Sequence, residues 1–559
     1  MAETLPRRHV FDVAIVGSGA GGGMAAYMLT KAGADVVMLE AGPMWNATAD
    51  GAMLKWPYES PRRGASTPTH AFGEFDACLG GWSIDGEPYT NAPGSRFDWW
   101  RARMLGGRTN HWGRISLRFG PDDFRRRSLD GLGDDWPIGY DDIKPYYDEI
   151  DRLIGVFGST ERLPNDPDGI FLPPPKPRCY ELLIKQACDK TGVRCIPNRL
   201  SILTQSHNGR AACHYCGQCN RGCKTNSNFS SPGVLIEPAL RTGRLSLVPN
   251  AMAREITVDD RHLATGVAYI DKITGADEHV RARVVVVAAS ACESARLLLN
   301  SNGLANSSGV VGKYLTDTTG TFAAGFVPSM VDRVPHNDDG TGGAHVYMPW
   351  WLDNKQLDFP RGYHIEVGSD YGVPSYGFMS DITDYNGGGG YGAGLKNDYR
   401  RYFGATVVFA GRGEMVPNAE SYCEIDPTVV DRWGIPVLRF HWKWSDYEYK
   451  QAKHMHETFR SIIAAMGGQV FAPMPTADEG YGLMPGGRII HELGTVRMGA
   501  DPAHSALNSW GQAHDVKNLF VADGGSFVSQ ADKNPTWTIL ALSMRTSEYI
   551  ANQRKAGAL

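Results

Sequence analysis

The chain has 559 residues, a formal net charge of -5 and ten cysteines. This length exceeds what one hydrophobic core organises, so we expect two to four domains. The small net charge, with no run of lysine or arginine, argues against nucleic acid or a membrane surface as the partner. No segment approaches the roughly 18 consecutive apolar residues that a membrane span needs, so no membrane span is expected.

The N-terminal region predicts a dinucleotide-binding fold. An apolar strand at 13–16 leads into a glycine turn, a helix at about 21–32 and a second strand at 35–39 that ends at Glu40. Glycine lets the backbone turn sharply and approach a pyrophosphate, and a carboxylate at this distance accepts ribose hydroxyls. This stretch alone leaves open FAD, NAD or a turn that binds nothing. The glycines in GxGxxG spacing are Gly17, Gly19 and Gly22.

A second glycine turn lies inside a long stretch, 43–119, that is rich in glycine, proline and aromatic residues. Loops of this length are usually functional or cover a cofactor. The turn reads MLGGRTNHW, and its two glycines suit a close approach of the backbone to a flat ring. We therefore predict cofactor contacts at Gly107, Asn110, His111 and Trp112.

Four crowded cysteines follow a proline-rich linker at 163–177 and a helix near 179–191. They are Cys213, Cys216, Cys219 and Cys223. Their spacing, Cys-x-x-Cys-x-x-Cys-x-x-x-Cys, is that of ferredoxin-type iron–sulfur ligation, although Lys224 replaces the proline of bacterial ferredoxins. We expect an iron–sulfur cluster with three or four irons. Structural zinc is the alternative, because four thiolates also suit a tetrahedral ion.

The remaining elements indicate a second domain inserted into the first. Apolar runs predict strands near 246–271 and 282–289, whereas alternating segments from about 320 to 468 predict a largely antiparallel sheet. A helix at 445–466 leads back to the first domain, which a final helix at 536–553 completes.

Motifs near the C-terminus complete a resemblance to the glucose–methanol–choline (GMC) oxidoreductase family. The segments HELGTVRMG, which begins at His491, NLFVADGG and KNPTWTI follow the N-terminal fingerprint and the LGGRTNHW turn in the family's order. The resemblance is good over the FAD-binding half and weak over 320–468. A helix signature that commonly reads Ser-Pro in the family reads Ser294-Ala295 here, so this motif is only partly matched.

The resemblance implies an α/β fold, α+β overall, with a Rossmann-type FAD-binding domain and a second, mainly antiparallel-sheet substrate domain. The implied FAD-binding domain is discontinuous and comprises 1–160, 225–320 and 470–559. An iron–sulfur segment spans 178–225, and the substrate-binding domain spans 321–469.

The resemblance also implies hydride transfer from an alcohol carbon to FAD, with His491 in the position of the family's catalytic base and Asn534 in that of its partner. Loss of the hydride leaves a developing carbonyl, so the hydroxyl proton must leave, and an imidazole with a pKa near ~6.5 accepts it. Asn534 orients the hydroxyl without adding charge. A hydrogen-bonded core histidine is the alternative for His491. Further FAD contacts are implied for Asp523, Gly524, Asn534 and Thr536.

His111 raises the question of a covalent flavin. In pyranose-oxidising members of the family, a Thr-His-Trp after the double glycine is bound covalently to the flavin methyl, and Asn110-His111-Trp112 stands in its place here. The alternative is that His111 only lines the flavin pocket.

The cysteines select a branch of the family, because GMC oxidases that pass electrons to oxygen need no iron. The segment CHYCGQCNRGC is similar to that of the large subunit of bacterial FAD-dependent glucoside 3-dehydrogenases, which oxidise the 3-hydroxyl of glucosides to 3-keto sugars. We expect a sugar dehydrogenase that passes electrons through the cluster to a c-type cytochrome. The alternatives are a gluconate, fructose or glucose dehydrogenase large subunit, a pyranose oxidase-like flavoenzyme with a structural metal, and a non-catalytic flavoprotein.

The resemblance further implies a small companion subunit that carries an export signal. Nothing before Asp12 resembles a secretory signal. The expected location is therefore the periplasm, by co-export with that subunit, or the cytoplasm if no such partner exists.

Overall fold

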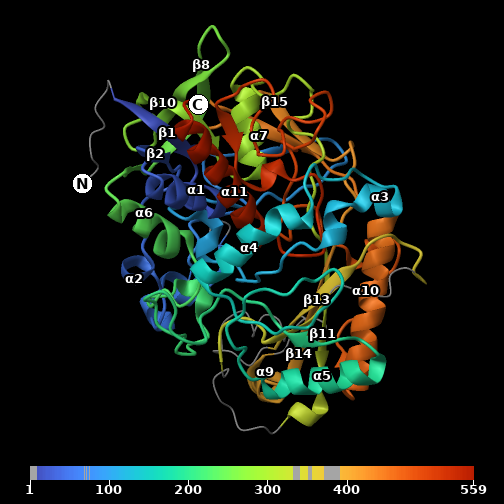
Figure 1. Ribbon diagram of the computed structural model, residues 1–559. Coiled ribbons are helices and arrows are strands. Elements are labelled where there is room, and N and C mark those ends of the chain that lie inside the picture. The colour runs from blue at the N-terminus through green and yellow to red at the C-terminus, as the bar shows by residue number, and fades with distance from the viewer. Residues whose placement is uncertain are drawn as a thin grey trace.

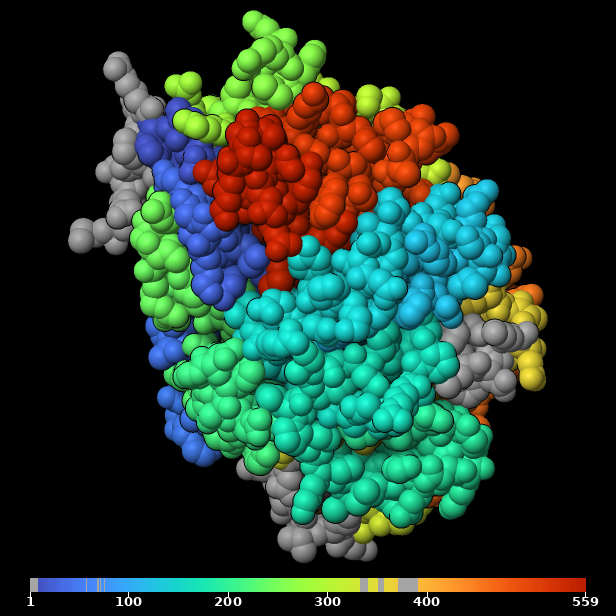
Figure 2. All heavy atoms as spheres, viewed as in Figure 1, coloured from blue at the N-terminus to red at the C-terminus, as the bar shows by residue number. Residues whose placement is uncertain are grey.

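The computed structural model describes residues 9–67, 70, 72–74, 76–331, 340–349, 356–369 and 391–559. Figure 1 shows two bodies, one around a mostly parallel sheet and one around an antiparallel sheet, with helix α4 (Tyr140–Ile154) running between them. In Figure 2 the C-terminal residues, in red, lie against the N-terminal residues, in blue. No helix within the described ranges is long and apolar enough to cross a membrane.

The first domain is built on a seven-stranded sheet. Its strands are β1 (Val10–Val16), β2 (Val36–Leu39), β7 (Leu245–Val248), β8 (Ala251–Val258), β9 (Ala264–Asp271), β10 (Asp277–Val287) and β18 (Leu519–Val521). The run β7-β2-β1-β10-β18 is parallel, with Val13 of β1 opposite Val36 and Val284. The central paired segments of these strands, at 13–16, Val36–Leu39 and 284–287, are apolar because helices and loops cover both faces of the sheet. Strands β8 and β9 extend the sheet in the antiparallel sense.

Three helices bring the distant parts of this domain together. They are α1 (Ala20–Lys31), α7 (Ala291–Asn300) and α11 (Thr536–Lys555). Helix α1 packs on α11, and α11 packs on α4. Because α1 and α11 come from opposite ends of the chain, this packing closes the discontinuous domain.

The second domain is a six-stranded antiparallel sheet in the order β17-β11-β14-β13-β12-β6. Its strands are β6 (Ile196–Pro197), β11 (Thr319–Phe326), β12 (Val346–Met348), β13 (Tyr363–Gly368), β14 (Thr406–Gly413) and β17 (Gln469–Val470). Helices α5 (Cys179–Thr191), α9 (Gly392–Tyr402) and α10 (Asp446–Ala465) lie around it (Figure 1). At the N-terminus of α10, the hydroxyl of Ser445 accepts the backbone N–H of Tyr447, and the backbone N–H of Ser445 donates to Glu448 at 2.7 Å. This capping box satisfies two backbone N–H groups that have no partner within the helix.

Smaller elements connect the two domains. A three-stranded sheet contains β4 (Thr90–Asn91), β15 (Tyr422–Val430) and β16 (Pro436–His441), and a two-stranded one contains β3 (Gly80–Gly81) and β5 (Arg101–Ala102). The short helices are α2 (Ala47–Asp50), α3 (Arg126–Asp130) and α6 (Glu237–Arg241).

The packing divides the chain differently from two predicted boundaries. Helix α5 and strand β6, predicted within the iron–sulfur segment 178–225, pack on α10 and pair with β12, so they belong to the second domain. Strands β15 and β16, predicted within 321–469, share the core of the first domain through Cys423 and Phe440. Alternation in a sequence predicts a strand but not the sheet that it joins. Residues 332–339, 350–355 and 370–390 of that range lie outside the described residues.

Candidate active site and cofactor cleft

A cleft of about 1290 Å³, its mouth included, opens at the carboxyl ends of the parallel strands. Ligands bind at this edge in doubly wound folds, because the strand order reverses there. The lining residues at the strand ends are Val16, Leu39, Ala288 and Asp523. The same cleft reaches His491 and Thr536, so one cavity joins the glycine turn to the predicted catalytic base.

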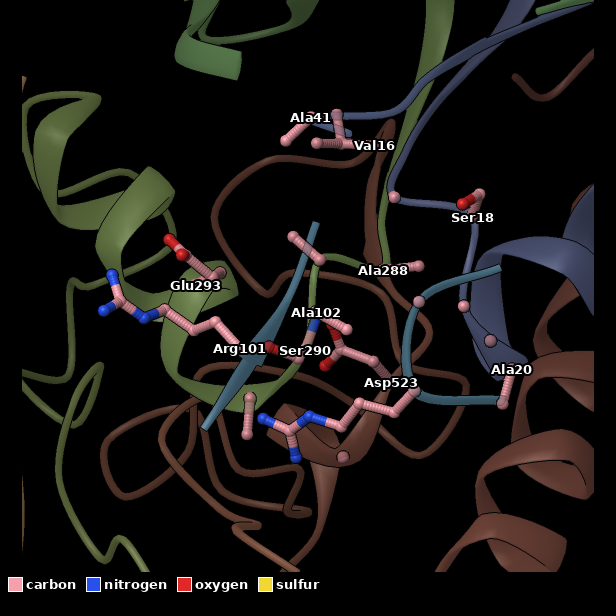
Figure 3. Close-up of a pocket in the computed structure, with 18 of the residues that line it drawn as sticks. Val16, Ser18, Ala20, Ala41, Arg101, Ala102, Ala288, Ser290, Glu293 and Asp523 are labelled. Carbon is pink, nitrogen blue, oxygen red and sulfur yellow. The ribbon is translucent and has the colours of Figure 1, made fainter. Parts of the chain in front are cut away.

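Figure 3 shows how the cleft is walled. Ser18 and Ala20 lie on one side, Arg101 and Glu293 lie on the opposite side, and Ser290 and Asp523 lie between them. The N-terminal residues of α1 and α11, Ala20 and Thr536, both line the cavity. Helix N-termini carry partial positive charge, so both ends favour the phosphates and the electron-rich edge of a dinucleotide.

The glycines of the first turn serve two different needs. A Cβ on Gly21 would collide with the carbonyl oxygen of Ala522, and one on Gly22 would collide with that of Gly17. These glycines therefore allow the helix to pack on the sheet. Gly19 lines the cleft, and a Cβ there would meet no protein atom within 4 Å. Its lack of a side chain instead leaves room for a ligand, as the pyrophosphate of a dinucleotide requires.

Glu40 lines the cleft at the end of β2, as the sequence predicts. Its side chain accepts the backbone N–H of Gly42 at 2.7 Å and the hydroxyl of Ser18. Burial raises the pKa of this carboxyl, while the bonds from Ser18 and Gly42 oppose the rise. The position suits a carboxylate that accepts ribose hydroxyls.

Asp523 and Arg101 add polar groups that a bound cofactor can use. Asp523 accepts the backbone N–H of Ser290 at 3.0 Å and of Gly525 at 2.8 Å, and burial raises its pKa to about 6. Arg101 is 2% exposed, and its Nε and Nη2 have no partner among the described residues. Nη1 donates to the carbonyl of Glu87 at 2.7 Å, so the buried guanidinium keeps two unused donor nitrogens in the lining of this cavity, which fits an anionic cofactor. Gly524 also lines the cleft and packs against Leu493.

The second glycine turn contacts the cleft through only part of its sequence. Gly107 and Trp112 line the cavity, as predicted, whereas Asn110 and His111 are absent from its lining. Asn110 donates to the carbonyl of Leu105 at 2.8 Å and so holds the turn. Nδ1 of His111 lies 3.8 Å from Asp76 Oδ1, and burial lowers the pKa of His111 to about 3.

His491 lines the cleft, and its imidazole meets Asn534, which is absent from the lining. Nε2 of His491 lies 3.4 Å from Nδ2 of Asn534, although 42 residues separate them in the chain. The backbone N–H of His491 donates to Asp317 at 2.9 Å, which holds the segment that carries the imidazole. Burial, with the nearby Arg412, lowers the pKa of His491 to about 3, so the imidazole is neutral at physiological pH.

Several residues around this pair were not predicted from the sequence. Nδ1 of His491 lies 3.0 Å from Oγ1 of Thr318, which accepts a bond from Gln530 at 2.7 Å. Asn534 donates to Glu366 at 3.2 Å. These residues stand in segments of weak family resemblance or in loops, and no local motif marks them.

The four predicted cysteine ligands line one small cavity of about 260 Å³. All four are free thiols. Burial, together with the three neighbouring thiols, raises the pKa of Cys213 to about 12. Its Sγ accepts the backbone N–H of Tyr215 at 3.4 Å, and Cys223 Sγ lies 3.4 Å from the hydroxyl of Thr225.

The glycine turn also connects the cleft with the cysteine segment. Trp112 lines the cleft, and Arg114, two residues later, interacts electrostatically with Cys219 and Cys223. The guanidinium of Arg114 is buried and donates to the carbonyl oxygen of Asn110 at 2.8 Å. The segment 112–114 therefore reaches both the cleft and the cysteine cavity.

The fold and the cleft define a dinucleotide-dependent oxidoreductase. Sequence profiles of the GMC oxidoreductase family match residues 21–319 and 417–543, and the chain belongs to this family. GMC oxidoreductases use FAD, a cofactor that the cleft fits, and the protein is an enzyme that acts on alcohol or sugar CH–OH groups.

Relatives of known activity cover nearly the whole chain. The chain is 31% identical to 2-methyl-1,2-propanediol dehydrogenase of Mycolicibacterium austroafricanum, over 97% of this chain and 95% of that protein. It is 27% identical to paromamine 6'-oxidase of Streptomyces fradiae, over 98% and 93% of the two chains. It is 24% identical to the fructose dehydrogenase large subunit of Gluconobacter japonicus, over 98% of each.

A solved structure supports the fold. Pyridoxine 4-oxidase from Mesorbium loti superposes with a TM-score of 0.60 at 17% identity, covering 98% of this chain and 99% of that one. At this identity the likeness concerns the fold alone.

Proposed function

We propose that this protein is an FAD-dependent sugar dehydrogenase that oxidises a secondary hydroxyl, the 3-hydroxyl of a glucoside, to a ketone. The observation that carries the proposal is the pairing of His491, which lines the cleft, with Asn534, whose Nδ2 lies 3.4 Å from His491 Nε2.

The side chains divide the chemistry between them. The substrate loses one proton from its hydroxyl and one hydride from the same carbon, and a carbonyl forms. Neutral His491 accepts the proton at Nε2, because its lowered pKa leaves the imidazole unprotonated. Asn534 holds the hydroxyl oxygen by a hydrogen bond without adding charge. FAD, when bound, supplies the acceptor for the hydride.

Two observations support a sugar substrate. The relatives are named for polyhydroxylated compounds, namely a propanediol, paromamine and fructose. The lining of the cleft also includes Trp112, and indole rings stack on the apolar faces of sugars. The choice of the 3-hydroxyl rests on the resemblance of the cysteine segment to glucoside 3-dehydrogenases.

The proposal includes an iron–sulfur cluster held by Cys213, Cys216, Cys219 and Cys223. Four free thiols that line one cavity, with backbone N–H groups directed at sulfur, fit such a cluster. Four thiolates around one zinc ion would lie about 3.8 Å apart, since Zn–S bonds are about 2.3 Å long. Among the described residues, no three of these thiols gather within 4.8 Å, so the four thiols do not form a ready-made tetrahedral zinc site. Such a cluster transfers electrons one at a time.

We extend the proposal to the partners. A cluster that releases one electron at a time fits a c-type cytochrome as the electron acceptor. The relatives include the large subunit of fructose dehydrogenase, a name that implies companion subunits in that enzyme. The proposed location is the periplasm, reached together with a small signal-bearing subunit.

An oxidase with structural zinc is the second candidate, because paromamine 6'-oxidase is similar over nearly its whole length. Anaerobic addition of methyl β-glucoside to the purified holoenzyme tests the main proposal. Flavin bleaching, iron content and a 3-keto product identified by NMR are expected. Rapid reoxidation by oxygen in a zinc-containing, iron-free protein would instead establish the oxidase.

A further inference from the structure

An ion pair on the second domain lies next to Asn534. Glu366 and His364 stand on β13, and Arg412 stands on β14. His364 pairs directly with Arg412 in the sheet, and Glu366 follows two residues later, so all three side chains share one face. Arg412 Nη2 lies 3.1 Å from Glu366 Oε2, and His364 Nε2 lies 3.4 Å from Oε1.

This ion pair reaches the catalytic residues directly. Nδ2 of Asn534 is 3.2 Å from Glu366 Oε1 and 3.4 Å from His491 Nε2. One amide group therefore joins the proton acceptor to the carboxylate. Because the same amide nitrogen contacts both groups, a second hydroxyl next to the one held at His491 can reach Glu366.

The carboxylate of Glu366 is charged and partly open. Burial alone would raise its pKa, but Arg412 and the bonds from His364 and Asn534 outweigh this effect and hold the pKa of Glu366 well below its ordinary value. The side chains of Glu366 and Arg412 are 18% and 20% exposed, whereas that of His364 is 1% exposed. An ionised carboxylate accepts about four hydrogen bonds, and three of these are used, so one acceptor position is available.

We infer that the Glu366–Arg412 pair binds the hydroxyl adjacent to the one oxidised, so that the enzyme selects neutral compounds with hydroxyls on neighbouring carbons. Glu366 accepts a hydrogen bond from that second hydroxyl, and Arg412 donates a hydrogen bond to its oxygen. The pair has no net charge, which favours a neutral hydroxyl over an ammonium or a carboxylate. This inference rests on the proposed oxidation at His491 but not on the identity of the sugar.

A purely structural role gives a different result. If Glu366 only held Asn534 in place, its loss would slow every alcohol by the same factor. If Glu366 binds the second hydroxyl, its loss removes only the preference for a diol, because a site that hydrogen-bonds a hydroxyl rejects analogues that lack it.

The test compares trans-1,2-cyclohexanediol with cyclohexanol, two neutral probes that differ by one hydroxyl. The FAD-loaded enzyme is mixed anaerobically with each probe, and flavin bleaching gives the limiting rate and the apparent Kd. We expect the wild type to prefer the diol by at least about tenfold in the ratio of rate to Kd. In the isosteric Glu366→Gln variant this preference should fall to about twofold or less, apart from any change in rate that the two probes share through Asn534.

Glu424 provides a matched control. It also stands on a strand beside an arginine and a histidine, with Arg439 Nε at 3.0 Å and His441 Nε2 at 2.9 Å, but its hydrogen bonds are to these two residues of β16 and not to Asn534. Glu424→Gln should keep the full preference for the diol. Equal loss for both probes in Glu366→Gln, or no preference in the wild type in either bleaching or binding, would overturn the inference.

The same assay separates this inference from the proposed function. If sugars fail to bleach the flavin while the diol preference is present and depends on Glu366, the sugar assignment is wrong and the inference holds. If methyl β-glucoside and its 2-deoxy and 4-deoxy analogues react equally well, the sugar assignment holds and the inference is wrong.

Discussion

Nδ1 of His491 lies 3.0 Å from Oγ1 of Thr318, a hydroxyl that also accepts a bond from Gln530. A hydroxyl oxygen has two lone pairs, so Thr318 can accept both from Gln530 and from an Nδ1–H. The amide nitrogen of Asn534, which only donates, lies 3.4 Å from Nε2, so the two contacts together favour the proton of neutral His491 on Nδ1 and leave the lone pair of Nε2 to act as a base.

Thr318→Val should therefore slow substrate-driven flavin reduction by roughly tenfold, since one hydrogen bond contributes about 1 kcal/mol and the tautomer is no longer fixed. Stopped-flow absorbance measures the rate. Thr316→Val is the matched control, because the buried hydroxyl of Thr316 has no partner among the described residues. A normal rate in Thr318→Val would show that the tautomer is set by another group.

The pH dependence follows from the lowered pKa of His491. The neutral imidazole is the active form, and its pKa of about 3 keeps it neutral well below the ordinary value of 6.5. We expect flavin reduction to show no acidic limb near pH 6.5 from this residue. Its folded-state pKa also lies below the unfolded value, so stability from this group is lost as pH falls from 6.5 toward 3.

Asp317 needs separate treatment in that experiment. Burial and the neighbouring Glu492 raise its pKa to about 7, and its carboxylate holds the backbone of His491. A limb near pH 7 that disappears in Asp317→Asn belongs to Asp317. A limb near 6.5 that persists in this variant would contradict the neutral assignment of His491.

The first glycine turn offers a pair of substitutions with opposite outcomes. Gly19→Ala should leave the thermal stability of the apo-protein unchanged, because its Cβ meets no protein atom within 4 Å, yet weaken FAD binding. Gly21→Ala should destabilise the apo-protein, because its Cβ collides with the carbonyl of Ala522. Thermal melts with and without FAD distinguish the two. Tight FAD binding by Gly19→Ala would show that the pyrophosphate lies elsewhere.

Much of this site could be predicted from the sequence, and the limit has a physical cause. One strand–turn–helix unit with local contacts contains Gly17, Gly19 and Glu40. His491 and Asn534 lie in sequence motifs that are specific to the family. Glu366 and Thr318 carry no such signal. They become part of the site only when β11 and β13 of the second domain meet the cleft, which is a matter of long-range packing.

The covalent flavin at His111 stays a prediction. His111 is outside the lining of the cleft, although its Nε2 is buried and has no partner in the described part of the chain. Intact mass of the acid-denatured holoenzyme measures the link directly, and an added flavin mass that His111→Ala removes is the expected result of attachment. Complete release of flavin by acid would exclude it.

The cysteines should separate the two halves of the reaction. Cys219→Ser should leave anaerobic flavin reduction by substrate unchanged, because the catalytic pair lies in another cavity, but lower iron content and block reduction of a cytochrome acceptor. Cys179→Ser is the control, since Cys179 is an exposed free thiol outside the cysteine cavity. Absorbance beyond the flavin bands should be lost in the first variant only. Normal cytochrome reduction by Cys219→Ser would mean that electrons leave by another route.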